Sequence, residues 1–186
     1  TANQEIGQLA YLNNPQRSGE EAFVNGSNTR SEVEEHLNEA KSLNNAMKQL
    51  RDKVAEKTNV KQSSDYINDS TEHQRGYDQA LQNAENIINA TPNVVLNKAT
   101  IEQALSRVQQ AQQDLDGVQQ LASAKQQATQ TVNGLNSLND GQKRELNQLI
   151  NSADTRTKVQ EELNKATELN HAMEAVRNSV QNGDQV

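Results

Sequence analysis

The sequence of 186 residues contains no cysteine and no tryptophan, and it has only one phenylalanine, three tyrosines and two prolines. The absence of cysteine excludes disulfides, thiolate metal ligands and cysteine nucleophiles. Leu, Ile, Val and Phe together number 36, or 19% of the residues, which is less than a thick globular core usually requires. The longest strongly apolar run is Val94–Leu96, so no segment of the sequence is expected to span a membrane.

Amides rather than charges make the chain polar. Asn and Gln number 47, whereas the acidic and basic residues together number 43. This composition argues against disorder driven by charge alone. The net charge is −7 and the 18 basic residues are spread along the chain, so we expect neither a nucleic acid nor a membrane surface as a partner.

An internal repeat appears when the sequence is compared with itself at an offset of 126. Residues 29–54 align without a gap with residues 155–180, and 13 of these 26 positions are identical. The match extends backwards, for example from Leu9 to Leu135 and from Asn13 to Asn139. Residues 121–126 of the second copy have no counterpart before Thr1. We therefore expect the chain to be a fragment of a longer array of repeats.

The spacing of apolar residues within each copy predicts helices. The aligned stretches share apolar residues at steps of three and four, which places these residues on one helical face. In the two copies they are Val33, Leu37, Ala40, Leu43, Met47, Leu50 and Val54, and Val159, Leu163, Ala166, Leu169, Met173, Val176 and Val180. Ser31 with Glu34, and Thr157 with Gln160, have the spacing of a capping box. With two shorter helices before each long one, each copy is predicted to form a three-helix bundle.

The middle of the chain contributes two further predicted helices. One apolar stripe runs from Tyr77 to Ile88 and ends before Pro92, which cannot donate a hydrogen bond within a helix. The next stripe continues from Ile101 to Leu135 without a proline and predicts one helix over residues 101–135. Such a helix would belong to two bundles, and the helix expected over residues 30–57 would do the same.

The predicted fold is therefore all-α, with three-helix bundles joined by long shared helices into an elongated rod. The expected domains are residues 1–57 (the first copy, truncated at its start), 58–120 (the middle bundle) and 121–186 (the second copy). A parallel coiled-coil dimer is the competing interpretation of the heptad-like spacing. Short loops favour antiparallel packing within one chain, so a monomer is expected, with neighbouring repeats as its partners.

Specific sequence stretches then suggest a family. The second copy, from LASAKQQATQTVNGLNSLN onwards, resembles the GA module, a three-helix bundle first known from albumin-binding surface proteins. The stretch SDYINDSTEHQRGYDQALQNAENIINATPN resembles the FIVAR module of bacterial surface proteins. Alternating modules of these two kinds are similar to the giant extracellular matrix-binding proteins of Gram-positive cocci. The resemblance covers essentially the whole chain.

The resemblance carries functional expectations. It implies a long helical rod on the outside of the bacterial cell wall, with possible ligands among fibronectin-like matrix proteins and serum albumin. It also implies roles in maintaining the cell envelope and tolerating osmotic stress. In albumin-binding GA modules the contact surface lies around the second helix and the start of the third. The corresponding residues here, Leu149–Val159, include no aromatic residue, and Phe23 of the first copy is expected in the core. We therefore expect weak or no albumin binding.

The residues that could carry chemistry are scattered. His36, His73 and His171 show no metal-ligand spacing and are expected on solvated faces. A solvated helix face is also the simplest interpretation of Glu34, Glu35, Glu39, Glu161 and Glu162. Met47 and Met173 are expected to fill cores, and Tyr11, Tyr66 and Tyr77 to make rim or core contacts. The sequence predicts no catalytic, cofactor-binding or metal site, and no cofactor.

Two classes of function remain after this search. The first is a structural spacer of the cell envelope, which the amide-rich faces and the scarcity of aromatic residues favour. The second is an adhesin, in which many weak copies of one site bind a matrix protein through avidity. An enzyme is the third class, and no constellation of residues supports it. A spacer fragment should bind no host protein, whereas an adhesin fragment should retain weak affinity for one.

Overall fold

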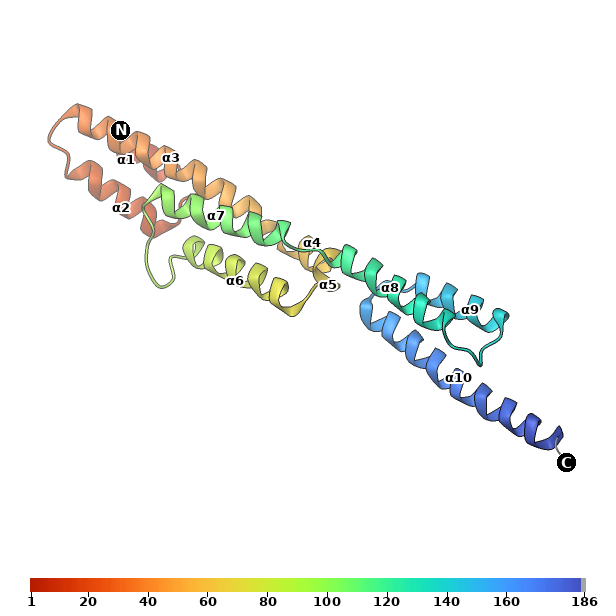
Figure 1. Cartoon of the computed structure of the whole chain (residues 1–186). Coiled ribbons are helices and arrows are strands. Elements are labelled where there is room, and N and C mark those ends of the chain that lie inside the picture. Colours follow the sequence, from red (N-terminus) through yellow and green to blue (C-terminus); the bar gives the residue numbers. More distant parts are fainter. Residues whose placement is uncertain (185–186) are drawn as a thin grey trace. The chain divides into compact units, whose positions relative to one another are not determined.

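The computed structural model describes residues 1–184 and consists of helices joined by short loops (Figure 1). No strand occurs among these residues, as the all-α prediction requires. The helices are α1 Ala2–Gly7, α2 Asn14–Asn25, α3 Arg30–Ala55, α4 Lys57–Gln62, α5 Ser64–Ile67, α6 Thr71–Ile88, α7 Lys98–Gln113, α8 Gly117–Asn133, α9 Asp140–Asn151 and α10 Arg156–Asp184.

Packing divides the chain into two compact units. Unit 1 consists of residues 1–62 and 71–115, and unit 2 consists of residues 63–70 and 116–186. The division into modules at residues 1–57, 58–120 and 121–186 concerns sequence repeats rather than packing, and it stays a prediction.

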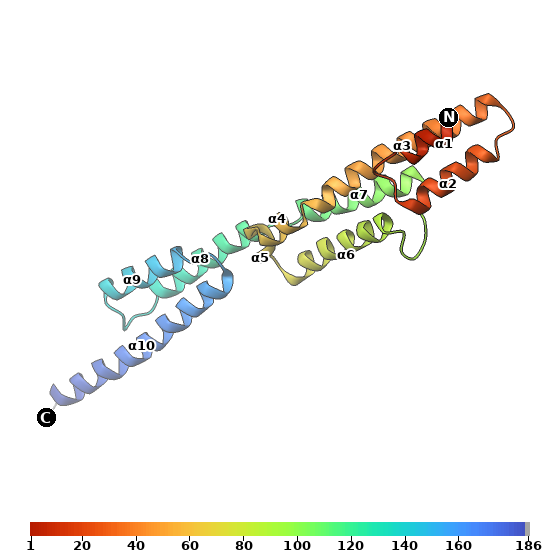
Figure 2. The ribbon, with the colours of Figure 1, turned by 180° about the vertical axis from the view of Figure 1, so that it is seen from behind.

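Unit 1 is organised around α3, which packs against α1, α2, α6 and α7. The short α1 and α2 contact α3, and so do α6 and α7, so that two bundles meet on one long helix (Figures 1 and 2). Ile6, Val24 and Ala40 form a core cluster between α1, α2 and α3. Further along α3, Leu43, Met47 and Leu50 are at most 1% exposed. The predicted sharing of this helix between two bundles is therefore confirmed.

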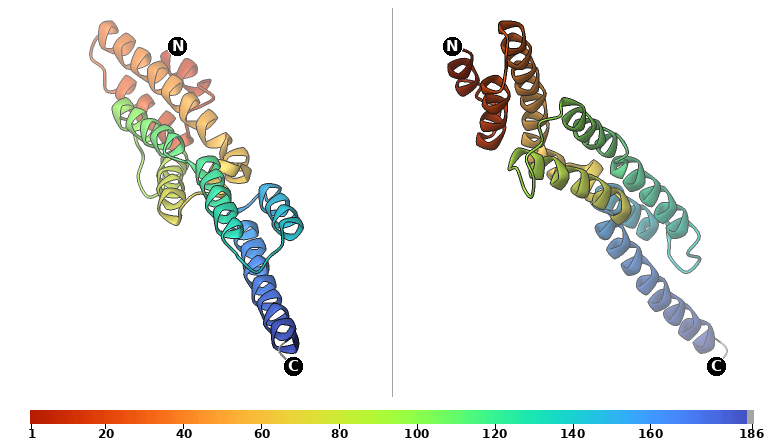
Figure 3. Two further views of the ribbon diagram at one scale, coloured as in Figure 1. Left: turned by 45° about the vertical axis from the view of Figure 1, so that its right-hand side comes forward. Right: turned by 90° about the vertical axis from the view of Figure 1, so that its left-hand side faces the viewer.

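Unit 2 contains a three-helix bundle of α8, α9 and α10. Its core residues come from all three helices and the loops between them: Ala128, Val132, Leu138, Leu146, Ile150, Ala153, Val159 and Ala166. The C-terminal half of α10 runs beyond the ends of α8 and α9 (Figure 3). Val176 and Val180 lie on this part of α10 and are 56% and 58% exposed.

Residues 63–70 complete unit 2 at the start of α8 and α10. Asn68 is buried, and its side-chain amide donates to the Asp154 carbonyl at 3.1 Å while its oxygen accepts from the Arg156 N–H at 2.9 Å. Asp69 accepts from the Asp116 N–H at 2.9 Å. These bonds supply partners for backbone groups at two helix N-termini, which a helix cannot satisfy internally.

The prediction of one helix over residues 101–135 was wrong. α7 ends at Gln113, and α8 begins at Gly117. Asp116 donates its N–H to Asp69 rather than to a carbonyl one turn back. A Cβ on Gly117 would lie within 3 Å of the Ser64 and Asp65 carbonyl oxygens, so the backbone of residues 63–70 packs where the helix breaks. This packing involves residues distant in sequence, and no proline marks it.

The starts of both long helices were predicted two residues too late, and the residues there form simple N-caps rather than the predicted capping boxes. Thr29 is the N-cap of α3, and its hydroxyl accepts from the Glu32 N–H at 3.2 Å. The Thr155 hydroxyl accepts in the same way from the Lys158 N–H at 3.0 Å. The two copies therefore start their long helices alike, at the Thr-Arg pair that they share.

Candidate functional site

One pocket of unit 1 lies where α2 meets α3 and the segment that leads into α7. We call it the junction pocket. Its volume is about 470 Å³, and it is lined by Glu20, Phe23, Glu39, Ser42, Leu43, Leu96, Asn97 and Lys98. The pocket therefore combines residues of the first repeat copy with residues 96–98 of the middle segment.

Several contacts hold the middle segment against α2. The Asn13 side-chain amide donates to the Ile87 and Ile88 carbonyls at 3.2 and 3.0 Å, at the C-terminal end of α6. Gln16 is buried, and its side-chain amide donates to the Val95 carbonyl at 2.9 Å. The Leu96 side chain sits so close to Gly19 that a Cβ there would lie 2.9 Å from Leu96 Cδ1. These contacts fix the wall of the junction pocket.

Glu20 lines the junction pocket and is only 3% exposed. Its Oε2 atom is buried and has no hydrogen-bond partner. Burial, and to a lesser extent the nearby Glu39 carboxylate, raise the pKa of Glu20 above its ordinary value of 4.5, while His36 partly opposes the shift. A buried carboxyl without a partner is costly for folding, so Glu20 is an exception that requires an explanation.

Phe23 is not a core residue, contrary to the expectation from its alignment with Leu149. Phe23 is 46% exposed, and its ring stacks on that of His36 with centroids 5.4 Å apart. Leu149 is 45% exposed, so the aligned position faces outward in both copies. The residues of α2 that are buried are Gln16, Glu20 and Val24, at steps of four. The apolar character of Phe23 therefore did not predict which face of α2 is buried.

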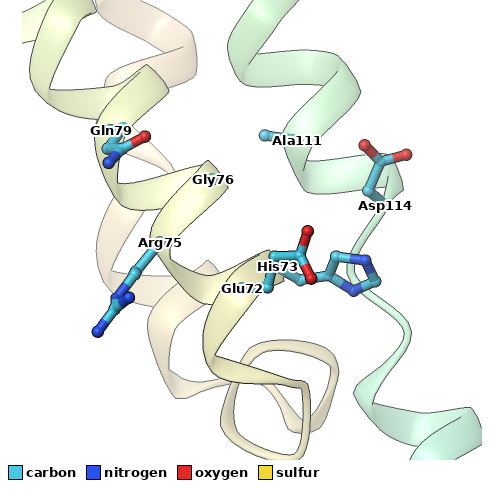
Figure 4. Close-up of a pocket in the computed structure, with 7 residues that line it drawn as sticks. All are labelled: Glu72, His73, Arg75, Gly76, Gln79, Ala111 and Asp114. Atoms are coloured by element: carbon cyan, nitrogen blue, oxygen red, sulfur yellow. The ribbon is translucent and has the colours of Figure 1, made fainter.

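A second hollow lies between α6 and α7 in unit 1. Two adjoining pockets of about 520 and 400 Å³ share Gly76, Gln79, Ala111 and Asp114 and form one open groove. Glu72 and His73 lie on the α6 side near Asp114, whereas the Arg75 side chain points away from α7 (Figure 4). The small residues Gly76 and Ala111 make the groove shallow. None of its residues was predicted as a site, and His73 was expected on a solvated face.

The remaining residues singled out in the sequence do not gather at one place. His171 is exposed on α10, and His36 and His73 are half-buried. Met47 is fully buried, and Met173 packs at the edge of the unit 2 core. Tyr77 is fully buried, Tyr66 is half-buried, and Tyr11 is 37% exposed with Lys48 Nζ 5.6 Å from its ring centroid.

The expectation of a solvated face was wrong for one acidic residue. Glu162 is only 3% exposed, and one of its oxygens lies 3.3 Å from Lys165 Nζ. Glu34, Glu35, Glu39 and Glu161 are exposed as expected. Glu162 precedes Leu163, which is partly buried and packs against the unit 2 core. The spacing of apolar residues does not show how far the buried face extends to either side of them.

In the second copy, the surface that corresponds to the albumin contact of GA modules lies at the end of α9 and the start of α10. Ile150, Ala153 and Val159 are buried there, which leaves Leu149 as the large exposed apolar side chain. Residues 149–159 contain no aromatic residue that could serve as a second exposed anchor. Among the described residues, no helix is both long and apolar enough to cross a bilayer.

Two family models match the chain. The GA module model matches residues 1–46 and 118–172, and the FIVAR domain model matches residues 46–116. Together the two models therefore match nearly all of residues 1–172.

Curated relatives are found in Staphylococcus aureus. The chain is 42% identical to the extracellular matrix-binding protein ebh of strain MW2 over 176 residues, and 42% identical to that of strain MRSA252 over 184 residues. These matches cover 95% and 99% of the chain but only 2% of each relative. The chain therefore spans a small part of the length of these relatives and is homologous to their repeat regions.

Solved structures show the same fold. The crystal structure of the 756–1003 domain of EbhA from Staphylococcus aureus matches with a TM-score of 0.85 and 30% identity, covering 89% of this chain and 68% of that one. A second structure matches with a TM-score of 0.59 and 31% identity, covering 62% of this chain and 91% of that one. It is described as part of a characterisation of Embp-mediated adherence of Staphylococcus epidermidis to fibronectin.

Proposed function

Because the chain belongs to the GA module family, with a FIVAR domain between its two GA segments, we propose that it is a non-enzymatic spacer of a giant bacterial surface protein. In this role the repeats stack into a rod on the outer side of the cell wall. The rod holds other parts of the polypeptide at a distance and bears mechanical load, and it binds no ligand. The neighbouring repeats of the same polypeptide are then its principal partners.

The observation that carries this proposal is the sharing of α3. Its first half packs on α1 and α2, and α6 and α7 also pack on it, so the GA segment and the FIVAR domain have one helix in common. A helix that is part of two cores resists bending between them, because bending would open one of the cores. A flexible linker between the two bundles would provide no such resistance.

An adhesin is the second candidate function. It is favoured by the similarity to a structure described in connection with adherence to fibronectin. A weak site repeated many times could bind a matrix protein through avidity if several copies engage it together. The surface that would bind albumin in a GA module offers one large exposed apolar side chain in each copy, Phe23 in the first and Leu149 in the second. Phe23 already stacks on His36 and the second copy has no aromatic anchor there, which is why albumin is the weaker candidate ligand.

A capture experiment separates the two functions. The chain is immobilised as a single copy and as a tandem of several copies, and plasma fibronectin and serum albumin are passed over both surfaces. The spacer proposal predicts no specific retention of either protein. Retention of fibronectin that rises steeply with the number of copies would replace the spacer with the adhesin.

A further inference from the structure

The junction pocket contains a feature that a spacer does not need. Glu20 lines it with 3% exposure, and its buried Oε2 atom has no hydrogen-bond partner. The second copy has Leu146 at the equivalent position, and Leu146 is part of the unit 2 core. An apolar residue therefore suits this position of the bundle. The carboxyl of the first copy lowers the free energy of unfolding, and no hydrogen bond to Oε2 compensates for its burial.

We propose that the junction pocket binds a primary alkylammonium group, with the Glu20 carboxylate as the acceptor of the ammonium. Phe23 and Leu96 provide apolar surface for an aliphatic stem, and Glu39, whose Oε2 lies 3.4 Å from His36 Nδ1, adds a second carboxylate to the lining. The terminal torsion of a glutamate is soft, so either oxygen of Glu20 can turn towards the pocket. A lysine side chain of a partner protein has this chemistry, and so does a free aliphatic amine.

The charges around the pocket favour a cation over an anion. Two carboxylates, Glu20 and Glu39, line the pocket with one basic residue, Lys98. Lys98 Nζ lies 3.5 Å from the Glu102 carboxylate, so its charge is already paired on α7. An anionic ligand would face two like charges, whereas an ammonium would satisfy the buried carboxylate.

An ammonium fits this pocket better than a guanidinium does. The Oε2 atom of Glu20 is buried, which favours a single donor that approaches as a point charge and needs only one oxygen, as an ammonium does. A guanidinium makes its strongest contacts through two parallel hydrogen bonds to both oxygens of a carboxylate. The volume of about 470 Å³ is ample for a four-carbon stem. The site goes beyond the proposed spacer function, which requires no ligand.

The test is a titration of the full chain with n-butylammonium, followed through the amide NMR signals of Phe23 and Leu96. We expect saturable shifts at these residues in the wild type and no comparable shifts around Leu146 and Leu149, which serve as an internal control. n-Butanol has the same stem without the charge and should bind about tenfold more weakly. Shifts that do not saturate, or that are equal with butanol, would overturn the proposal.

Two variants and one matched control decide whether Glu20 is the acceptor. Glu20→Gln preserves the shape and removes the charge, and we expect it to weaken n-butylammonium binding about tenfold. Glu34→Gln removes an exposed charge elsewhere and should leave binding unchanged. Glu20→Leu introduces the residue of the second copy and should lose binding while raising the melting temperature. Unchanged binding in Glu20→Gln would contradict the proposal.

A second arm identifies the source of the ammonium. Nα-acetyl-lysine methylamide represents a lysine side chain in a protein, and 1,5-diaminopentane represents a free amine. Tighter binding of the lysine derivative assigns the site to a protein partner, and tighter binding of the diamine assigns it to a small molecule. Absence of binding by both, with no binding of n-butylammonium, would refute the site. Lys98→Met should strengthen binding of every probe, because Lys98 is the one cation that lines the pocket.

Discussion

Met47 and Met173 occupy the same position of the two repeat copies, and their surroundings differ. Met47 is 0% exposed on α3, whereas Met173 lies at the edge of the unit 2 core on α10. Three residues further on, Leu50 is 0% exposed and its counterpart Val176 is 56% exposed. In unit 1, α6 and α7 pack on α3, and among the described residues of unit 2 no such pair packs on α10.

The comparison shows that one apolar stripe serves two successive cores. The first half of the stripe closes the bundle of its own repeat in both copies. The second half is buried only where the helix pair of a FIVAR domain packs on it. An amphipathic pattern thus specifies which face of a helix will be buried, and the neighbouring module determines whether burial occurs.

The largest expected effect is a difference between Met47→Ala and Met173→Ala. Removing the buried Met47 side chain should cost about 2–5 kcal/mol of the free energy of unfolding of unit 1, because it leaves a cavity. Met173→Ala should cost unit 2 about 1 kcal/mol, because its side chain is already partly exposed. Urea unfolding followed by NMR signals of each unit measures both. Equal losses in the two variants would contradict the comparison.

Asn68→Ala should destabilise unit 2 by about 2–3 kcal/mol and leave unit 1 unchanged. The buried Asn68 side chain bonds to the Asp154 carbonyl and the Arg156 N–H, and its loss leaves both groups unsatisfied. Thr29 and Thr155 cap the starts of α3 and α10 alike, and α10 has in addition the bond from its Arg156 N–H to Asn68. The same denaturation series provides the test, with the exposed Asn38→Ala on α3 as a matched control. An Asn68→Ala loss below that of the control would show that residues 63–70 do not stabilise unit 2.

Glu20→Leu and Leu146→Glu, which each introduce the residue of the other copy, should change the free energies of unfolding of units 1 and 2 in opposite directions. Glu20→Leu is expected to stabilise unit 1 by about 1–2 kcal/mol at pH 7, because it removes a buried, unpartnered carboxyl. Leu146→Glu should destabilise unit 2 by a similar or larger amount. Thermal melts of the two variants measure both changes.

The effect of Glu20 should also depend on pH. Its pKa is raised in the folded protein above the ordinary value of 4.5, so the folded state binds the proton more tightly than the unfolded state does. The free energy of unfolding of unit 1 should therefore fall as the pH rises from 4.5 through the folded-state pKa. The gain from Glu20→Leu should be larger at pH 7 than at pH 4.5. A gain that is constant with pH would show that Glu20 titrates normally.

The smallest expected effect is at Ala90, after the end of α6. Ala90 has a φ of 55°, in the left-handed region that disfavours residues with a Cβ. Ala90→Gly should relieve this strain and stabilise unit 1 by about 0.5 kcal/mol, after the greater unfolded-state freedom of glycine is subtracted. Unit 2 should not change. Destabilisation of unit 1 by this variant would show that the loop does not tolerate the added freedom.

Much of the fold could be predicted from the sequence because helical spacing is a local signal. The faces of α3 and α6, and the sharing of α3, follow from the steps of three and four between apolar residues. The break at Gly117 could not be predicted in this way, since it depends on the backbone of residues 63–70. Its signal in the sequence was the short run Asp-Leu-Asp-Gly, which interrupts otherwise good helix formers.

The junction pocket was also beyond the reach of helical spacing. In the sequence, Gly19 and Glu20 only stand opposite Glu145 and Leu146 of the second copy. The structure places Leu96 against Gly19 and encloses Glu20 in a pocket, through contacts between residues more than 70 positions apart. A mismatch between the two copies at these positions was the only hint that the sequence offered, because such mismatches indicate different surroundings.

Amide hydrogen exchange on the intact chain tests most directly whether the shared α3 makes the GA segment and the FIVAR domain one mechanical body. The free energies of opening are measured in the centres of α2 and α6, in the wild type and in Met47→Ala. The account predicts that both helices open together and lose the same free energy in the variant. A loss in α6 alone, with α2 protected as in the wild type, would show that the two bundles are independent and would contradict the account.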